Sequence, residues 1–179
     1  SNYYSNSYQN LLDWGHQNGV TLIASAGNDG NNTPQYPAAY NHVISVAATN
    51  GNDSKASFSN YDNGTGWVDL AAPGTSIYST VPTSLGSYDY KQGTSMSGPI
   101  VAGLAGLMLS LNPGLTPSDI ESCLKNNCDP ATGTYASSLG AGRIDAGASM
   151  NCVASTLSWA PQAEFTSNVT TIAAGGSVN

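Results

Sequence analysis

A serine beside the start of a predicted helix, Ser95, is the first candidate for chemistry in this 179-residue chain. It stands in the heptapeptide 93–99, GTSMSGP, where most of its neighbours are small. The run Ile100–Leu111 behind it is apolar on nearly all sides and predicts a buried helix, with Pro99 in its first turn. Unpaired N–H groups at a helix start stabilise a developing negative charge, so this position suits a nucleophile.

The same residues also fit a purely structural interpretation. Thr94, Ser95 and Ser97 are all good helix N-caps, and Gly-Thr-Ser before an apolar helix is an ordinary helix start. From the residues alone, a nucleophile and a helix cap therefore both remain open.

A second polar candidate, Asn28, follows an apolar run. The run Val20–Ala26 predicts a strand buried on both faces, and the loop Gly27–Gly30 ends it. Open α/β sheets place ligand sites just beyond the carboxyl ends of their strands, which is where Asn28 falls. The alternative is an ordinary turn asparagine beside Gly27.

The elements that must position these candidates predict an α/β fold, a three-layer α/β/α arrangement with a mostly parallel sheet. Two alternating arms before the Ser95 helix predict a hairpin. The predicted helices are Tyr8–Asn18, Ile100–Leu111, Thr116–Lys125 and Ala146–Met150; the predicted strands are Val20–Ala26, Val43–Ala48, Val68–Ala71, Ile77–Val81 and Tyr88–Lys91.

Several segments, in one order, resemble the subtilisin-like serine proteases. Segment 93–99 resembles the serine motif of that family, with Ser97 where alanine is usual, and Ile100 replaces a common histidine. Segment 24–30, ASAGNDG, is similar to the oxyanion-hole segment. The other matching segments are 36–38, 43–48, 56–60, 69–74 and 140–146.

The resemblance implies a serine endopeptidase whose subtilisin-like sheet is incomplete at its N-terminal side. Ser95 would be the nucleophile, while the Asn28 side chain and the Ser95 N–H would hold the oxyanion. The catalytic Asp and His would come from an upstream part of the catalytic domain, in D-[ST]-G-like and H-G-T-like settings. His16 and His42 fall at the amino edge of the predicted sheet, so neither is expected to act as the base.

The resemblance also implies a pocket for the residue before the scissile bond. Ser25, Ala26, Gly27 and Asp29 would line it. The small Ala26 and Gly27 favour large apolar groups, and Asp29 at the rim is suited to a basic group or is simply a solvated loop carboxylate.

Composition limits the partners. Four Lys and Arg against eleven Asp and Glu give a net charge of −7, which argues against binding to nucleic acid or an anionic membrane. No run of eighteen apolar residues is present, so no membrane span is predicted. The expected partners are a polypeptide substrate and the N-terminal remainder of the same catalytic domain, and the expected location is extracellular.

The three cysteines, Cys123, Cys128 and Cys152, leave one thiol over. We expect Cys152 to pair with Cys123 or Cys128 in an oxidising compartment. Calcium is a possibility that the family resemblance raises, but the loop carboxylates lack ligand spacing and no metal site or other cofactor is predicted.

The chain divides at about residue 155. Residues 1–155 are interpreted as the C-terminal part of a subtilisin-like peptidase domain, and residues 156–179 as a linker and the first strands of a truncated PKD-like, immunoglobulin-like β-sandwich. A β-rich tail packing on the first domain is the alternative for the second segment. Alternatives for the function are a catalytically dead subtilisin-like pseudoenzyme, a binding module, and an adhesion protein inferred from the tail alone.

Overall fold

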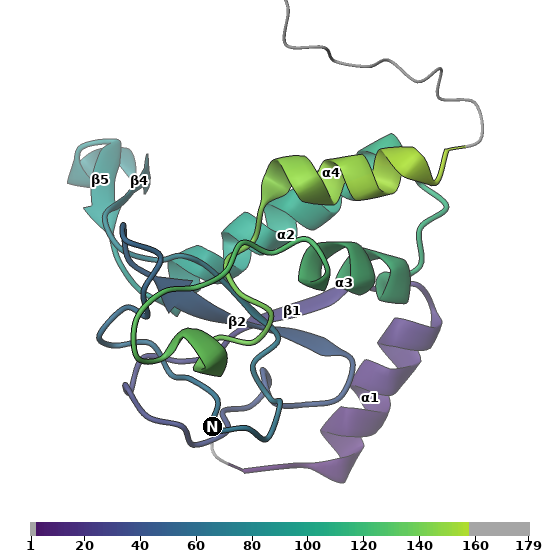
Figure 1. Ribbon diagram of the computed structural model, residues 1–179, viewed down its shortest axis with the longest axis horizontal. Coiled ribbons are helices and arrows are strands. Elements are labelled where there is room, and N and C mark those ends of the chain that lie inside the picture. Colours follow the sequence, from purple (N-terminus) through teal and green to yellow (C-terminus); the bar gives the residue numbers. More distant parts are fainter. Residues whose placement is uncertain (1–2, 158–179) are drawn as a thin grey trace, which may run out of the picture.

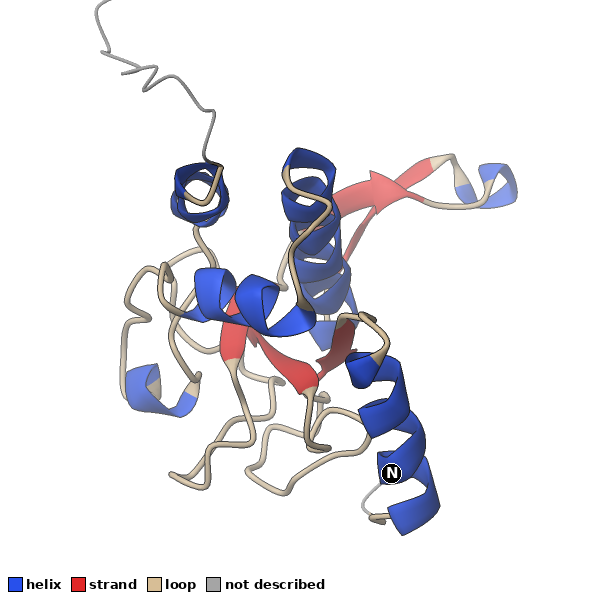
Figure 2. Ribbon diagram, turned by 90° about the vertical axis from the view of Figure 1, so that its right-hand side faces the viewer, coloured by secondary structure: helices blue, strands red, loops and turns tan. Residues whose placement is uncertain are grey.

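A computed structural model describes residues 3–157 and shows an α/β fold. Helices α2 (Thr94–Leu111), α3 (Pro117–Lys125) and α4 (Ala146–Ser155) lie on one side of a parallel sheet, and α1 (Asn6–Gln17) lies on the other side with several long loops (Figures 1 and 2). The predicted PKD-like strands lie outside the described residues.

The sheet contains β1 (Leu22–Ser25), β2 (Val43–Thr49) and β3 (Leu70–Pro73), in the order β1-β2-β3 with parallel pairing. All seven residues of β2 are buried, which confirms the strand expected from its continuous apolar run. The prediction that β1 is buried on both faces is wrong, since its four residues are only half-buried. It is the edge strand of the sheet formed by the described residues, so its outer edge is not paired with another strand there.

Helix α2 begins six residues earlier than its apolar run predicts. Its N-cap is Gly93, which makes no side-chain capping bond, so the interpretation of Thr94, Ser95 or Ser97 as the cap is wrong. Pro99 is inside the helix rather than in its first turn. The left-handed backbone of Gly93, with φ 142°, lets the chain turn into the helix without a capping side chain.

Helix α2 is also less buried than predicted. One face packs on β1, β2 and β3, whereas Gly103, Gly106 and Leu107 on the other face are exposed. By length and composition alone, with a mean hydropathy of 1.4, this helix is long and apolar enough to cross a membrane, although it contains no unbroken run of eighteen apolar residues. Its packing against the whole sheet is that of a core helix.

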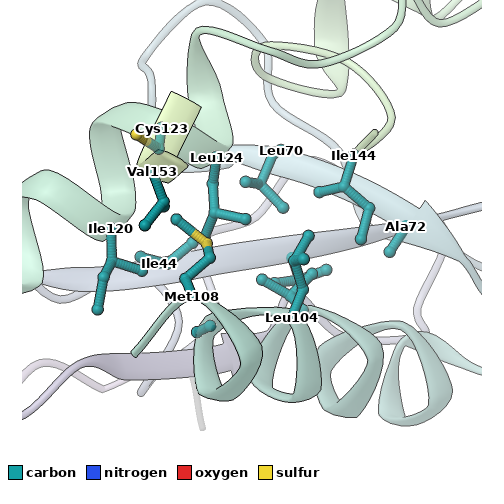
Figure 3. Close-up of a cluster of buried hydrophobic side chains, with 13 residues drawn as sticks. Ile44, Leu70, Ala72, Leu104, Met108, Ile120, Cys123, Leu124, Ile144 and Val153 are labelled. Atoms are coloured by element: carbon teal, nitrogen blue, oxygen red, sulfur yellow. The ribbon is translucent and has the colours of Figure 1, made fainter. Parts of the chain in front are cut away.

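The main core lies between the sheet and helices α2, α3 and α4 (Figure 3). Its completely buried residues include Val46, Leu70, Val101, Met108, Ile120, Leu124 and Val153. A disulfide between Cys123 and Cys152 joins α3 to α4, which confirms one of the two predicted pairings; Cys128 is free.

The hairpin before α2 is confirmed. Strands β4 (Ile77–Thr80) and β5 (Tyr88–Lys91) pair antiparallel and project from the body of the molecule (Figure 1). The hairpin leads directly into Gly93 and the first turn of α2, so it forms one side of the region around Ser95.

Candidate active site

Thr94 joins the first turn of α2 to the end of β1. Its side chain is completely buried. The N–H and Oγ1 of Thr94 both donate to Asn28 Oδ1, at 2.9 and 3.0 Å, and Oγ1 accepts from the Gly27 N–H at 3.2 Å. The Thr94 carbonyl accepts from Ser25 Oγ at 2.7 Å. These bonds place Asn28 beside the helix start that carries Ser95.

The same bonds orient the Asn28 amide. Because Oδ1 accepts two bonds from Thr94, Nδ2 is the Asn28 group left to donate to a ligand. A Cβ built on Gly93 would lie 3.6 Å from Asn28 Nδ2 and 3.7 Å from the Ser95 nitrogen. Asn28 Oδ1 lies 3.7 Å from the same point but is already used by Thr94. Asn28 Nδ2 and the Ser95 nitrogen are therefore close to one another beside Gly93, as the two donors of an oxyanion hole must be.

Ser95 is the second residue of α2, and its side chain is exposed. Its N–H is among the first N–H groups of the helix, which have no acceptor within the helix. A hydroxyl that is open to a ligand therefore stands next to a free N–H donor, and the glycine at position 93 leaves the approach open.

The end of β3 holds the same turn from the other side. The Gly93 N–H donates to the Gly74 carbonyl at 2.8 Å, and Ser97 Oγ donates to the Ala72 carbonyl at 3.0 Å. Ser97 is completely buried, so its hydroxyl serves this contact and does not face a ligand.

The residues predicted to line a substrate pocket lie in one loop, but in different environments. Ala26 is completely buried, and the Ser25 hydroxyl is occupied by Thr94. The open side of Gly27 faces other side chains, which limits the room that its missing side chain leaves. Asp29 is exposed and is the one carboxylate among the four.

Two residues that fill this space were not identified from the sequence. A Cβ on Gly27 would lie 2.5 Å from Asn60 Nδ2 and 3.3 Å from Gln35 Cγ. Gln35 Nε2 also donates to Asp29 Oδ2 at 3.4 Å. Asn60 falls in a segment that the resemblance had marked, although no role was inferred for it.

A mostly apolar cavity of about 280 Å³ lies beside Ser95, between α2 and the β4–β5 hairpin. Met96, Pro99, Ile100 and Ile77 contribute to its lining. A larger cavity of about 590 Å³ lies around His42 and Asp69, but its lining includes neither Ser95 nor Asn28. The candidate site is therefore identified by Ser95 and Asn28 and not by the volume of a cavity.

The structure places both histidines at the amino edge of the sheet. Their ring centroids lie 4.2 Å apart in a stacked arrangement. His16 is in the last turn of α1, and His42 directly precedes β2. Ser25, which contacts the turn of Ser95, pairs with Val46, four residues after His42. That separation along the strand is about 13 Å at 3.3 Å per residue. Neither histidine is within the ~3 Å that a general base requires.

Asp69 has structural partners at the same edge. Its carboxylate accepts from the Lys125 ammonium at 2.7 Å and from the Ser45 N–H at 2.8 Å. Burial lowers the pKa of Lys125, but its bonds to Asp69 and Glu121 outweigh this effect and raise it. Asp69 is therefore held by a lysine and does not orient an imidazole.

The loop carboxylates considered for calcium do not fit that ion. Asp53 pairs with Arg143 at 2.7 Å, and Asp89 pairs with Lys91 at 2.6 Å. Asp62 accepts from the N–H groups of its own turn, including Gly64 and Gly66 at 2.9 Å each. Across residues 3–157, no group of three or more His, Cys, Asp or Glu is arranged to hold a metal.

A family model described as the subtilase family matches residues 1–143. The chain belongs to the subtilase family. Thermitase from Thermoactinomyces vulgaris is 45% identical over 126 residues, which are 70% of this chain and 43% of that protein. An extracellular protease from Xanthomonas campestris pv. campestris is 40% identical over 153 residues, covering 82% of this chain and 26% of that protein.

Solved structures support the same fold. A protease from Pseudoalteromonas arctica superposes with a TM-score of 0.72 at 35% identity, over 84% of this subtilase chain and 48% of that one. The patellamide maturation protease PatA superposes with a TM-score of 0.75 at 28% identity, over 85% and 58% of the two chains. The chain spans less than half the length of the two curated relatives named above.

Proposed function

We propose that residues 1–155 are the C-terminal part of a subtilisin-like serine endopeptidase domain. The observation that carries this proposal is that Asn28 Nδ2 and the Ser95 nitrogen both lie within 4 Å of one point beside Gly93. In the reaction, Ser95 Oγ attacks the scissile carbonyl carbon, and the carbonyl oxygen becomes an oxyanion held by these two donors. The Ser95 proton passes to an imidazole base and then to the leaving amine.

The base and the carboxylate that orients it belong to a complementary part of the domain. Three observations support this assignment. The curated relatives are more than twice as long as the matched region, β1 has an unpaired edge, and α2 has an exposed face with Gly103, Gly106 and Leu107. The apolar cavity beside Ser95 suits a segment that brings the base to the hydroxyl.

The substrate is a polypeptide, and the protease works outside the cell. The Cys123–Cys152 disulfide supports an oxidising location, and relatives include proteins named as extracellular proteases. The residue before the scissile bond binds against Asp29 and the backbone around Gly27. Residues 156–179 form a linker and the beginning of a PKD-like module.

The second candidate is a pseudoenzyme that keeps this fold for binding. The absence of a usable histidine from the described residues is the observation that favours it. The two candidates differ in the complementary part, which carries an Asp and a His only in the active protease.

The experiment joins this chain to a complementary subtilase segment that carries the Asp and His, and measures hydrolysis of a chromogenic peptide. We expect turnover that disappears in Ser95→Ala. The matched control is Ser118→Ala, since Ser118 is an exposed serine on α3 that takes no part in the site. Turnover that persists in Ser95→Ala removes Ser95 as the nucleophile and contradicts the proposal. A well-folded fusion without turnover favours the pseudoenzyme.

A further inference from the structure

A completely buried asparagine, Asn60, binds the loop on both sides of the oxyanion donor. Its Nδ2 donates to the Ala26 carbonyl at 3.0 Å, two residues before Asn28. Its Oδ1 accepts from the N–H groups of Asp29 at 2.9 Å and Asn31 at 3.3 Å, which follow Asn28. One side chain therefore uses a donor and an acceptor to fix the backbone around Asn28.

The backbone of Asn60 completes this contact. Its N–H donates to the Gly27 carbonyl at 2.9 Å, directly before Asn28. Gly27 has φ 107°, and a Cβ there would lie 2.5 Å from Asn60 Nδ2. The loop therefore packs on Asn60 as closely as a glycine allows, and it has no room to shift toward Asn60.

Asn60 is itself firmly anchored. The neighbouring Ser59 hydroxyl donates to the Asn60 carbonyl at 2.9 Å and accepts from the Ala48 N–H of β2 at 2.9 Å. The Lys55 ammonium binds three carbonyls of the same segment, those of Ala56, Ser57 and Ser59. Asn60 therefore connects the loop that carries Asn28 to β2, a fully buried strand.

Asn28 by contrast is exposed, and among residues 3–157 its side chain is held through the two bonds that Thr94 donates to Oδ1. The direction of Nδ2 depends on where the loop places the Asn28 backbone relative to Thr94. We propose that Asn60 is a positioning residue for the oxyanion donor, holding loop 26–31 so that Asn28 Nδ2 and the Ser95 N–H face one point. This inference rests on the proposed protease function.

The test uses Asn60→Asp in the joined, active protease. The aspartate keeps an acceptor for Asp29 and Asn31 but removes the donor to Ala26. We expect kcat per active site to fall about tenfold, the effect of losing one positioning hydrogen bond, with KM within about twofold. Active sites are counted by fluorophosphonate labelling, so that a partly unfolded sample does not imitate a catalytic loss.

The matched control is Asn50→Asp, because Asn50 also accepts two N–H bonds, from Asn52 and Ser54, in a turn away from Asn28.

A double-mutant cycle with Asn28→Ala separates positioning from a general structural role. If Asn60 acts through Asn28, Asn60→Asp has no further effect on kcat once Asn28 is alanine. An equal loss in both backgrounds, or an unchanged kcat in Asn60→Asp alone, overturns the inference.

Hydrogen exchange distinguishes this inference from the proposed function. If the wild-type fusion folds but has no Ser95-dependent turnover, the protease proposal fails, and Asn60→Ala is then compared with wild type by amide exchange. Faster exchange at Asp29 and Asn31, with β2 still protected, supports the holding role of Asn60. Unchanged exchange at those two amides overturns it.

Discussion

Asn28 Oδ1 accepts the backbone N–H of Thr94 at 2.9 Å, although 66 residues separate them in the sequence. This one bond does two things. It brings the loop after β1 against the start of α2, and it uses the oxygen of the Asn28 amide so that the nitrogen faces the ligand side. The site is therefore assembled by the packing of β1 against α2 before any substrate arrives.

Asn28→Ala removes one of the two oxyanion donors. In the active protease we expect kcat to fall about 10²–10³-fold, the loss known for removing such a donor in a bacterial subtilase, with KM near normal. The reason is that the bond to the substrate oxygen strengthens only as negative charge develops. Steady-state kinetics on a chromogenic peptide measure both constants, and a wild-type kcat in Asn28→Ala removes Asn28 from the site.

Thr94→Val tests the residue that orients Asn28. The valine keeps the shape of the buried side chain but loses the Oγ1 bonds to Asn28 and Gly27. We expect kcat to fall about tenfold and the free energy of unfolding to fall by about 1–3 kcal/mol.

The control for Thr94→Val is Thr49→Val. Thr49 is also completely buried, but its hydroxyl has no hydrogen-bond partner within residues 3–157. This variant should be neutral or stabilising in denaturant unfolding, because an unpaired buried hydroxyl is lost. Equal destabilisation by the two valines would show that the Thr94 hydroxyl has no special role.

Gly93→Ala places a methyl group close to both oxyanion donors, Asn28 Nδ2 and the Ser95 N–H. The added Cβ would lie 3.6 and 3.7 Å from them, in the space that the substrate oxygen needs, and alanine disfavours φ 142°. We expect kcat/KM to fall at least about tenfold. Gly51→Ala in an exposed turn is the control, since no atom lies within 4 Å of its Cβ and its backbone is outside the left-handed region. A Gly93→Ala enzyme with normal kcat/KM would contradict the geometry of the hole.

Cys128 is predicted to be a protected thiol. Burial, followed by the nearby Asp129 carboxylate, raises the pKa of Cys128 to about 11. Alkylation by iodoacetamide at pH 8 should therefore be slow in the folded protein and fast after denaturation, as followed by mass spectrometry. The pKa of the Cys128 thiol is higher in the folded protein than in the unfolded chain. The thiol's contribution to the free energy of unfolding is therefore present at neutral pH and is lost as the pH rises from about 9 to 11. Rapid alkylation of Cys128 in the native protein would contradict its burial.

Much of the fold follows from local patterns. The continuous apolar run Val43–Ala48 predicts β2 because a parallel strand is buried on both faces, and the alternating arms predict the β4–β5 hairpin. The start of α2 was missed since Pro99 suggested a first turn, whereas the turn is held by bonds from Asn28 and Gly74, distant in sequence.

The candidate site was predicted in part. A helix start and a strand end made Ser95 and Asn28 candidates but left a helix cap and a turn asparagine open, and their roles came from the family resemblance. The structure brings their loops together. The contributions of Thr94 and Asn60 were not predicted, because a threonine before the serine and an asparagine in a loop carry no local signal of a contact 29 or more residues away. The half-buried state of β1 depends on which strands lie beside it, which its own residues do not specify.

Fluorophosphonate labelling tests the central claim most directly, because the reagent reacts with a serine that a base and an oxyanion hole activate. The chain joined to the complementary Asp- and His-bearing segment is treated with the probe, and the modified residue is located by peptide mapping. We predict labelling of Ser95, loss of the label in Ser95→Ala, strong slowing in Asn28→Ala, and no labelling of the 179-residue chain alone. A folded fusion in which Ser95 stays unlabelled, or in which the probe modifies a different residue, would contradict the account.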